Sequence, residues 1–296
     1  MLAGAILLGA LIVIAGRAIR GGESGGGDVA QAPAVATIVE LTPILPTLTP
    51  TIPAPPTATP PPQAPIAAAA GRVVCLDPGH GGIDLGNVRV ENGQITLQEK
   101  DFTLSNALEI QRRLQEKGVV VVLTRSTDSE ANPNNLDVNG DGEVASPDGP
   151  ANSSELDDLQ ARITICNDAG ADLLVSIHYN GAENTALEGY EVWYSGNREF
   201  SDASASFATT IHEELGTQFA AAGFDMFDKG IGIEDHAVTG PAREGKLTPS
   251  AMPGAVVEGL FLSNDGNAAI VQTPEGQNAI VTAYENAILR WLDENP

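Results

Sequence analysis

Residues 74–82 read Val-Cys-Leu-Asp-Pro-Gly-His-Gly-Gly, an apolar run that ends abruptly in a glycine-rich turn carrying a histidine. A second apolar run, from Leu173 to Ile177, ends in a similar way at His178. Short apolar runs of this kind predict buried strands. Ligands in α/β folds gather where the strands end, so we expect the imidazoles of His80 and His178 to lie close together.

From residue 71 onward, short apolar runs alternate with segments of helical periodicity. This alternation predicts a single α/β domain over 71–296, with helices covering a sheet. Strands are expected at 72–76, 119–123, 173–177, 189–194 and 255–259. Helices are expected at 101–117, 154–169, 201–221 and 275–292.

The N-terminal part of the chain has a different composition. Residues 2–16 are almost wholly apolar or small and are followed by Arg17 and Arg20. This run is shorter than the roughly 17–25 residues of a bilayer span and suits the apolar core of a signal peptide. Because the basic residues follow the run rather than precede it, residues 1–20 are predicted as either a signal peptide or a membrane anchor.

Residues 21–70 are rich first in Gly and Ser and then in Pro and Thr. Such a segment cannot bury a core, so it is predicted to be a disordered linker. A spacer behind an apolar N-terminus is typical of an exported enzyme that reaches away from its membrane. We therefore expect the protein in the cell envelope or outside the cell, either secreted or membrane-anchored through residues 2–16.

Charge and cysteine content restrict the partners and the chemistry. The chain has 39 acidic and 15 basic residues, a net charge of −24. Such a surface repels phosphate backbones, which excludes nucleic acid as a partner. Cys75 lies in a predicted strand and Cys166 in a predicted helix. Two cysteines so placed are more often separate buried apolar side chains than a disulfide.

An insertion at 126–152 is longer than a usual connection and rich in Asp, Asn and Gly. Within it, positions 1, 3, 5 and 12 of a twelve-residue loop carry oxygen ligands, and position 6 is glycine. The four ligand positions are Asp137, Asn139, Asp141 and Asp148. This spacing is similar to a calcium-binding EF-hand loop of the dockerin kind and predicts Ca²⁺. The alternative is a polar surface loop.

Two imidazoles and one carboxylate form the ligand set of many catalytic zinc sites, which leave the fourth position open. His80 and His178 supply the imidazoles, and Glu99 at the start of a helix supplies the carboxylate. Glu258 ends an apolar strand, where a carboxylate is costly unless it has a partner or a task. Beside such a site it would serve as a general base, whereas the alternative is a salt-bridged residue at a strand end.

Further segments follow in a characteristic order. They are Asp77 to Gly82, Glu99-Lys100-Asp101, Leu123-Thr124-Arg125, Leu159 to Arg162 followed by Asn167, Ser176-Ile177-His178 with Asn180, and Val257-Glu258 running to Ser263-Asn264. Together they resemble the zinc-dependent N-acetylmuramoyl-L-alanine amidases of the Amidase_3 type. The resemblance covers about residues 72–293.

The resemblance implies a mixed, roughly six-stranded sheet flanked by helices. It implies zinc on His80, Glu99 and His178, with Glu258 as the catalytic carboxylate. The implied reaction is hydrolysis of the amide between N-acetylmuramic acid and L-Ala in peptidoglycan, by water activated at zinc. Asn180 is a candidate second hydrogen-bond donor to the oxyanion. An activator protein is a candidate partner besides peptidoglycan.

Three alternatives share some of these features. A different zinc hydrolase, either a stem-peptide peptidase or a sugar deacetylase, could use the same metal ligands. A non-catalytic or regulated peptidoglycan-binding module could share the fold, but it would be favoured by the loss of a ligand or of Glu258, and all four residues are present. A calcium-dependent adaptor would rest on a single loop.

Overall fold

The computed structural model describes residues 69–145 and 153–296. The strands in this part of the chain are β1 (Val73–Pro78), β2 (Val88–Glu91), β3 (Gln94–Gln98), β4 (Val120–Leu123), β5 (Leu173–Asn180), β6 (Tyr190–Tyr194), β7 (Asp228–Ile233) and β8 (Gly254–Phe261). The helices are α1 (Glu99–Glu116), α2 (Ser153–Asp168), α3 (Ser201–Ala221), α4 (Asp265–Val271) and α5 (Pro274–Glu294).

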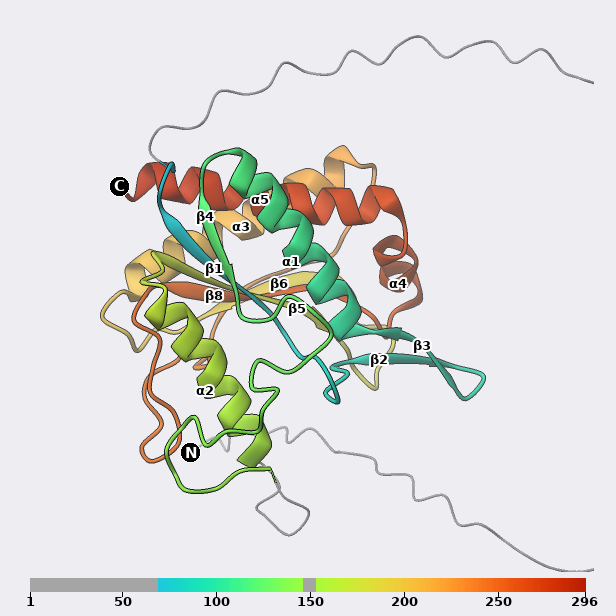
Figure 1. The fold of residues 1–296 in the computed structure, drawn as a ribbon. Helices are drawn as coiled ribbons and strands as arrows, with labels where there is room; N and C mark the ends of the chain where they lie inside the picture. The colour runs from blue at the N-terminus through green and yellow to red at the C-terminus, as the bar shows by residue number, and fades with distance from the viewer. Residues whose placement is uncertain (1–68, 146–152) are drawn as a thin grey trace, which may run out of the picture. The chain divides into compact units, whose positions relative to one another are not determined.

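Six of these strands form one mixed sheet in the order β4-β1-β5-β8-β6-β7 (Figure 1). Neighbouring strands from β4 to β8 run parallel, β6 is antiparallel to β8, and β7 is parallel to β6. The strands β2 and β3 form a separate antiparallel hairpin. The predicted mixed, six-stranded α/β fold is thus confirmed.

The two faces of the sheet are covered differently. Helices α1, α3 and α5 lie on one face, and α2 lies on the other (Figure 1). Successive side chains of a strand point to opposite faces. On β5, therefore, Leu173, Val175 and Ile177 enter the large core beneath α1, α3 and α5. Leu174 and His178 instead face the side of α2, where a smaller core includes Leu174.

Every strand and helix predicted from the sequence is present, with ends shifted by at most three residues. The sequence analysis missed the hairpin β2–β3, the edge strand β7 and the short helix α4. Strand β7 reads Asp-Lys-Gly-Ile-Gly-Ile, and its glycines weaken the pattern by which a strand is recognised. The hairpin is short and largely exposed, so it lacks a buried apolar face.

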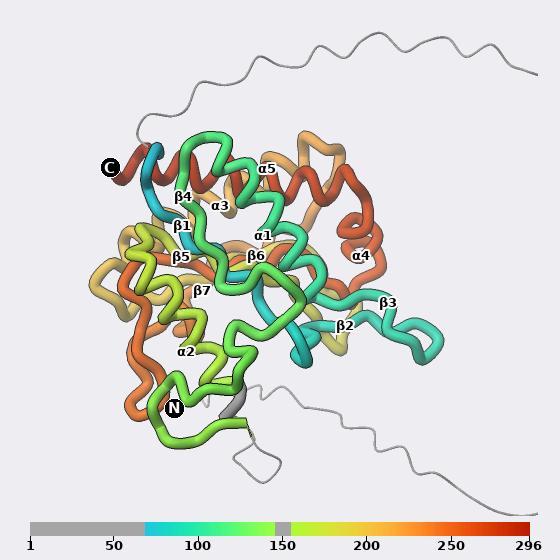
Figure 2. Tube along the Cα trace, in the orientation of Figure 1, coloured from blue at the N-terminus to red at the C-terminus, as the bar shows by residue number. Residues whose placement is uncertain are grey.

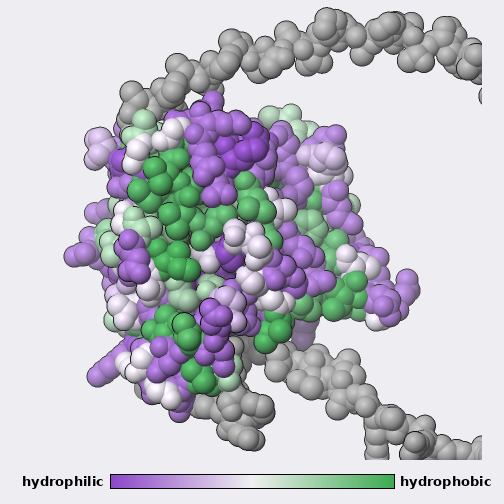
Figure 3. All heavy atoms as spheres, in the orientation of Figure 1, coloured by the Kyte–Doolittle hydropathy of each residue, from purple (hydrophilic) through white to green (hydrophobic). Residues whose placement is uncertain are grey.

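Strand β4 is the outer strand beside β1, and no further strand of the described chain pairs with its free edge. In Figure 3, hydrophobic residues gather on the side of the molecule where β4 lies, surrounded by hydrophilic ones. Val120 of this strand is 47% exposed. After β4 the described part of the insertion runs alongside α2 (Figure 2).

The expectation for the two cysteines was wrong. Cys75 of β1 and Cys166 of α2 form a disulfide, with their Cα atoms 5.5 Å apart. Both residues are fully buried, as their patterns predicted. The patterns could not show that the two buried faces meet, because that depends on where α2 crosses the sheet. A disulfide fits an exported protein in an oxidising compartment.

The predicted signal peptide or anchor (1–20) and nearly all of the linker (21–70) lie outside the described residues. Among the residues that are described, no helix combines the length and the apolarity needed to cross a bilayer.

The disulfide links β1 to α2 across 91 positions of the chain. We expect the double substitution Cys75→Ala with Cys166→Ala to lower the free energy of unfolding by about 2–5 kcal/mol, because a cross-link of this span restricts the unfolded chain. Urea denaturation of the oxidised protein, the dithiothreitol-treated protein and the double variant measures this. Three coincident unfolding curves would show that the bond is absent or contributes nothing.

Candidate metal centre

The three predicted metal ligands meet at one edge of the sheet. His80 follows β1, Glu99 is the first residue of α1, and His178 lies near the end of β5. His80 Nε2 is 3.1 Å from Glu99 Oε2, and His178 Nδ1 is 3.0 Å from Glu99 Oε1. Within the described residues, this is the one group of at least three His, Cys, Asp or Glu side chains whose ligand atoms all lie within 4.8 Å of one another.

The turn that carries His80 is held by two arginines. His80 has φ 62°, a left-handed conformation that residues other than glycine rarely adopt. Arg125 donates from Nε to Pro78 O and from Nη2 to Gly79 O, both at 2.9 Å. Arg162 donates to Pro78 O at 2.9 Å and to His80 O at 2.7 Å. The arginines therefore fix the carbonyl groups on the inner side of the turn, which stabilises the strained backbone.

Arg162 is itself anchored by a buried carboxylate. It donates from Nη1 to Asp77 Oδ1 at 2.8 Å, and both residues are at most 4% exposed. Thr124 and Ser176 donate further hydrogen bonds to Asp77, at 2.7 and 2.8 Å. Although burial works in the opposite direction, Arg162 holds the pKa of Asp77 below its usual value. The pair is thus charged, hydrogen-bonded and able to orient the turn.

The ring of His80 has one nitrogen available for a metal. Its Nδ1 lies 2.8 Å from Asp84 Oδ2, while Nε2 faces Glu99. Metal-binding histidines commonly hold a carboxylate on the nitrogen that does not bind the ion, which fixes the ring. Burial works against protonation, but the hydrogen bonds to Asp84 and Glu99 raise the pKa of His80 to about 10. Without a metal the ring is thus a cation, and a bound cation would take the place of its proton.

Glu99 is buried, and both of its oxygens accept hydrogen bonds from the surrounding backbone. Tyr179 N donates to Oε1 at 2.8 Å, and Asn87 donates to Oε2 from its backbone N at 2.8 Å and from Nδ2 at 3.0 Å. Although burial opposes ionisation, the hydrogen bonds to His178 and His80 lower the pKa of Glu99. The carboxylate is therefore ionised and fixed in place, as a metal ligand needs to be.

Two glycines leave the room that the three ligands occupy. A Cβ atom at Gly79 would lie 2.2 Å from Cε1 of His178. At Gly86, which has φ +65°, a Cβ atom would lie 2.6 Å from both Glu99 Oε2 and His80 Cδ2. Because they have no side chain, Gly79 and Gly86 let the backbone approach the predicted ligands closely.

Glu258 lies beside the three ligands on the neighbouring strand. In the sheet register it is paired with His178, and paired residues point to the same face. Its Oε2 is buried and has no hydrogen-bond partner in the described part of the chain. Burial raises the pKa of Glu258 to about 7. A carboxyl group in this position can take up and release a proton near neutral pH.

Asn180 lies two residues beyond His178 on the same strand, and one N–H of its side-chain amide is hydrogen-bonded. Its Nδ2 donates to Glu191 Oε1 at 2.6 Å. Glu191 of β6 is paired in register with Glu258, and the sequence analysis did not identify it. The signal was present, because Glu191 is a charged residue within an apolar strand, as Glu258 is.

The described part of the predicted calcium loop is coiled around its first side chain. Asp137 accepts hydrogen bonds from Gly140 N at 2.8 Å and Gly142 N at 3.0 Å. Asn139 accepts from Asp141 N at 3.0 Å. The fourth predicted ligand, Asp148, lies outside the described residues.

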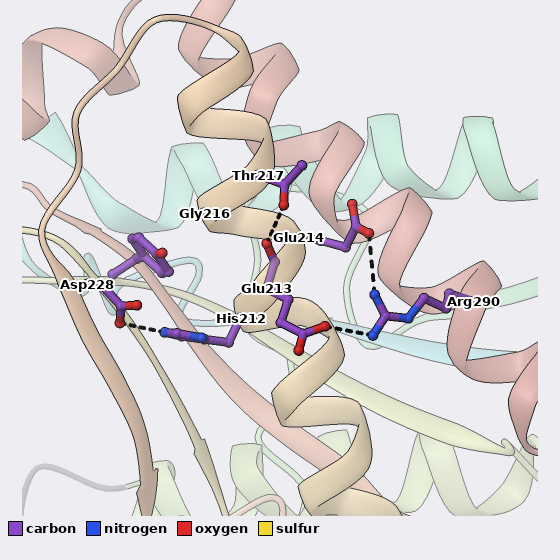
Figure 4. Close-up of a pocket in the computed structure, with 8 residues that line it drawn as sticks. His212, Glu213, Glu214, Gly216, Thr217, Asp228 and Arg290 are labelled. Carbon is purple, nitrogen blue, oxygen red and sulfur yellow. Dashed lines mark hydrogen bonds and ion pairs between the residues drawn. The ribbon is translucent and has the colours of Figure 1, made fainter.

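A separate hollow of about 550 Å³ lies between α3, α5 and the start of β7 (Figure 4). His212 on its wall is paired with Asp228 at 2.7 Å, and Arg290 is paired with Glu213 at 2.7 Å. None of the metal-centre residues lines this hollow, so it is distinct from the site described above.

Comparisons with known proteins agree with this arrangement. The germination-specific N-acetylmuramoyl-L-alanine amidase of Bacillus subtilis (strain 168) is 29% identical over 227 residues, covering 76% of this chain and 81% of that protein. N-acetylmuramoyl-L-alanine amidase AmiA of Salmonella typhimurium is 26% identical over 254 residues, covering 75% of this chain and 78% of that protein.

Solved structures show the same fold. The catalytic domain of CwlV, an N-acetylmuramoyl-L-alanine amidase from Bacillus (Paenibacillus) polymyxa var. colistinus, has a TM-score of 0.55 at 27% identity and covers 75% of this chain and 98% of its own. The CwlD amidase from Clostridioides difficile, in complex with the GerS lipoprotein, has a TM-score of 0.59 at 23% identity, over 75% of this chain and 98% of its own. The second likeness concerns the fold alone.

The model of the Amidase_3 family, described as N-acetylmuramoyl-L-alanine amidase, matches residues 74–290, which include all four residues of the predicted catalytic site. The chain therefore belongs to the Amidase_3 family of N-acetylmuramoyl-L-alanine amidases.

Proposed function

We propose that the protein hydrolyses the amide bond between the lactyl group of N-acetylmuramic acid and L-Ala in peptidoglycan, with a zinc ion held by His80, Glu99 and His178. The observation that carries this proposal is the buried Oε2 of Glu258, which has no partner and belongs to a side chain paired with His178. A buried polar atom without a partner is costly, and it is commonly explained by a role toward a ligand.

The donor set fits zinc, which accepts nitrogen and carboxylate oxygen ligands and in catalytic sites keeps one position open. When bound, Zn²⁺ supplies a Lewis acid that polarises the scissile carbonyl and activates water. Glu258 accepts the proton of the attacking water at Oε2 and then passes it to the departing amine of L-Ala. Asp84, which holds Nδ1 of His80, would leave Nε2 of that ring free to bind the ion.

The same family fold could also hold peptidoglycan without cleaving it, or cut within the stem peptide. Digestion of purified peptidoglycan separates these functions. We expect stem peptides with a free L-Ala amine, identified by mass spectrometry, and we expect a zinc chelator to abolish their release and added zinc to restore it. New ends within the stem peptide would instead identify a peptidase. Zinc binding without any cleavage would identify a binding module or an enzyme that needs an activator.

Glu258→Gln tests the general base separately from the metal. We expect this variant to bind zinc as the wild type does and to lose about 10²- to 10⁴-fold in kcat, because the amide cannot accept the proton. Glu116→Gln, at the exposed end of α1, is the matched control and should keep full activity. A zinc-loaded Glu258→Gln variant that works at the wild-type rate would remove Glu258 from this role.

We also propose that the insertion binds Ca²⁺ through Asp137, Asn139 and Asp141. Besides the coiled loop, a buried carboxylate on α2 supports the proposal. Asp157 Oδ1 accepts hydrogen bonds from Val138 N at 2.7 Å and Asn139 N at 3.2 Å, so this carboxylate lies against the loop. Asp157 is fully buried, and its Oδ2 has no partner in the described chain. A nearby cation would compensate for that buried oxygen.

Asp141→Ala removes one ligand from this loop. We expect calcium to raise the melting temperature of the wild type but not of this variant, because only a bound ion stabilises the folded state by mass action. Glu143→Gln is the control, since the seventh position of such a loop contributes its backbone carbonyl rather than its side chain. Calorimetric scans with calcium, with magnesium and with chelator measure the shifts. A wild-type protein that shows no calcium shift would make the insertion a plain surface loop.

We further infer that the protein acts in the cell envelope, where its substrate is found. The disulfide between Cys75 and Cys166 supports export, because such bonds persist in oxidising compartments. Residues 2–16 would then be a signal sequence or an anchor. An activator protein is proposed as a partner by analogy with CwlD, which is found in complex with a lipoprotein.

A further inference from the structure

Glu191 on β6 is the third polar residue in a row that crosses the sheet beside the metal centre. Glu258 on β8 is paired in register with His178 on one side and with Glu191 on the other. Because directly paired residues of neighbouring strands point to the same face, the three side chains follow one another across the face covered by α2. Glu191 is therefore the nearest neighbour of Glu258 on the side away from the metal ligands.

The carboxylate of Glu191 is largely removed from water, since its side chain is 14% exposed. Two carboxylates side by side repel each other, and a shielded one is costly unless it is compensated. Lys229 on the edge strand β7 provides that compensation, with Nζ 3.3 Å from Glu191 Oε2. The other oxygen, Oε1, accepts the short hydrogen bond from Asn180. Both oxygens of Glu191 thus have a partner: Oε2 forms an ion pair with Lys229, and Oε1 accepts a hydrogen bond from Asn180.

The hydrogen bond with Glu191 determines the orientation of the Asn180 carboxamide, that is, which side its NH₂ group and its carbonyl oxygen face. A carboxamide has two N–H donors and one carbonyl acceptor, whereas an ionised carboxylate can only accept. Glu191 therefore selects the NH₂ group of Asn180 and excludes the flipped amide. The carbonyl Oδ1 of Asn180 accepts from Gly181 N at 3.2 Å. The second N–H of the Asn180 side chain then has no hydrogen-bond acceptor among the described residues.

We propose that Glu191 is a positioning residue, which fixes Asn180 so that its second N–H can donate to the substrate carbonyl oxygen as negative charge develops there. Lys229 holds Glu191 in place through the ion pair, and Glu191 itself does not touch the substrate. Donors placed in advance around a developing oxyanion lower the barrier without reorganisation. This inference rests on the proposed amidase function, and it adds the residue that determines the orientation of the donor.

The test uses four variants of the full chain: Asn180→Ala, Glu191→Ala, Glu191→Gln and the double variant Asn180→Ala with Glu191→Ala. We expect Asn180→Ala to lower kcat by up to about 10²-fold with little change in KM, because the donor acts mainly in the transition state. Glu191→Ala should lower kcat in the same way, and the double variant should be no worse than Asn180→Ala. Glu191→Gln should retain most of the activity, since its Oε1 can still accept from Asn180.

Two further measurements separate positioning from a general structural effect. Zinc content and melting temperature should be unchanged in all four variants. The side-chain amide of Asn180, followed by NMR, should have one N–H proton shifted downfield by the hydrogen bond to residue 191 in the wild type and in Glu191→Gln. In Glu191→Ala this downfield shift should be lost. This measurement does not depend on turnover.

Additive losses in the double variant would overturn the inference, because Glu191 would then act independently of Asn180. Equal losses in Glu191→Gln and Glu191→Ala, together with a shifted pH profile, would also overturn it and would mean that Glu191 acts through its charge on Glu258. If zinc-loaded wild type had no activity, the proposed function would fail. The Asn180 amide signals would still decide whether Glu191 fixes that side chain.

Discussion

The buried ion pair between Arg162 and Asp77 is the interaction on which the metal centre depends. Asp77 is the one charged residue of β1, and Arg162 reaches it from α2 with a 2.8 Å hydrogen bond. From this position Arg162 also binds the carbonyl oxygens of Pro78 and His80. Removal of Arg162 would leave the buried carboxylate of Asp77 without its ion-pair partner, and it would also release the turn that carries the first metal ligand.

Helix α2 joins this interaction to the other unusual features of the chain. Cys166 of the helix is bonded to Cys75 of β1, only two residues before Asp77. Asp158 accepts from both Arg162 Nε at 2.8 Å and Asn132 N at 2.9 Å, so the same helix holds the start of the insertion. Movement of α2 would therefore disturb the disulfide, the insertion and the His80 turn together. The contacts of α2 thus hold both the insertion and the metal centre in place.

The sequence allowed prediction of the elements that have a strong local pattern. His80 and His178 could be predicted to lie close together because each ends an apolar run, and Glu99 could be grouped with them because it begins a helix. The arginines that hold the His80 turn could not be assigned that role, since their partners are backbone carbonyls from a strand end distant in sequence. The disulfide was missed for a related reason, because burial of each cysteine is a local property and their meeting is not. Strand β7, at the sheet edge and interrupted by glycine, lacked a pattern altogether.

The alternation of side chains between the two faces of the sheet explains how several polar groups can lie together at the metal centre. The row of His178, Glu258 and Glu191 faces α2, and the row directly before it faces the opposite side. That second row is Ile177, Val257 and Val192, all fully buried beneath the helices of the large core. Each strand thus contributes one polar side chain to the site and one apolar side chain to the core at successive positions. The burial of the apolar row offsets the cost of the polar row. The mixed strand order, with β6 antiparallel to β8, brings the carboxylate of Glu191 into line with His178 and Glu258.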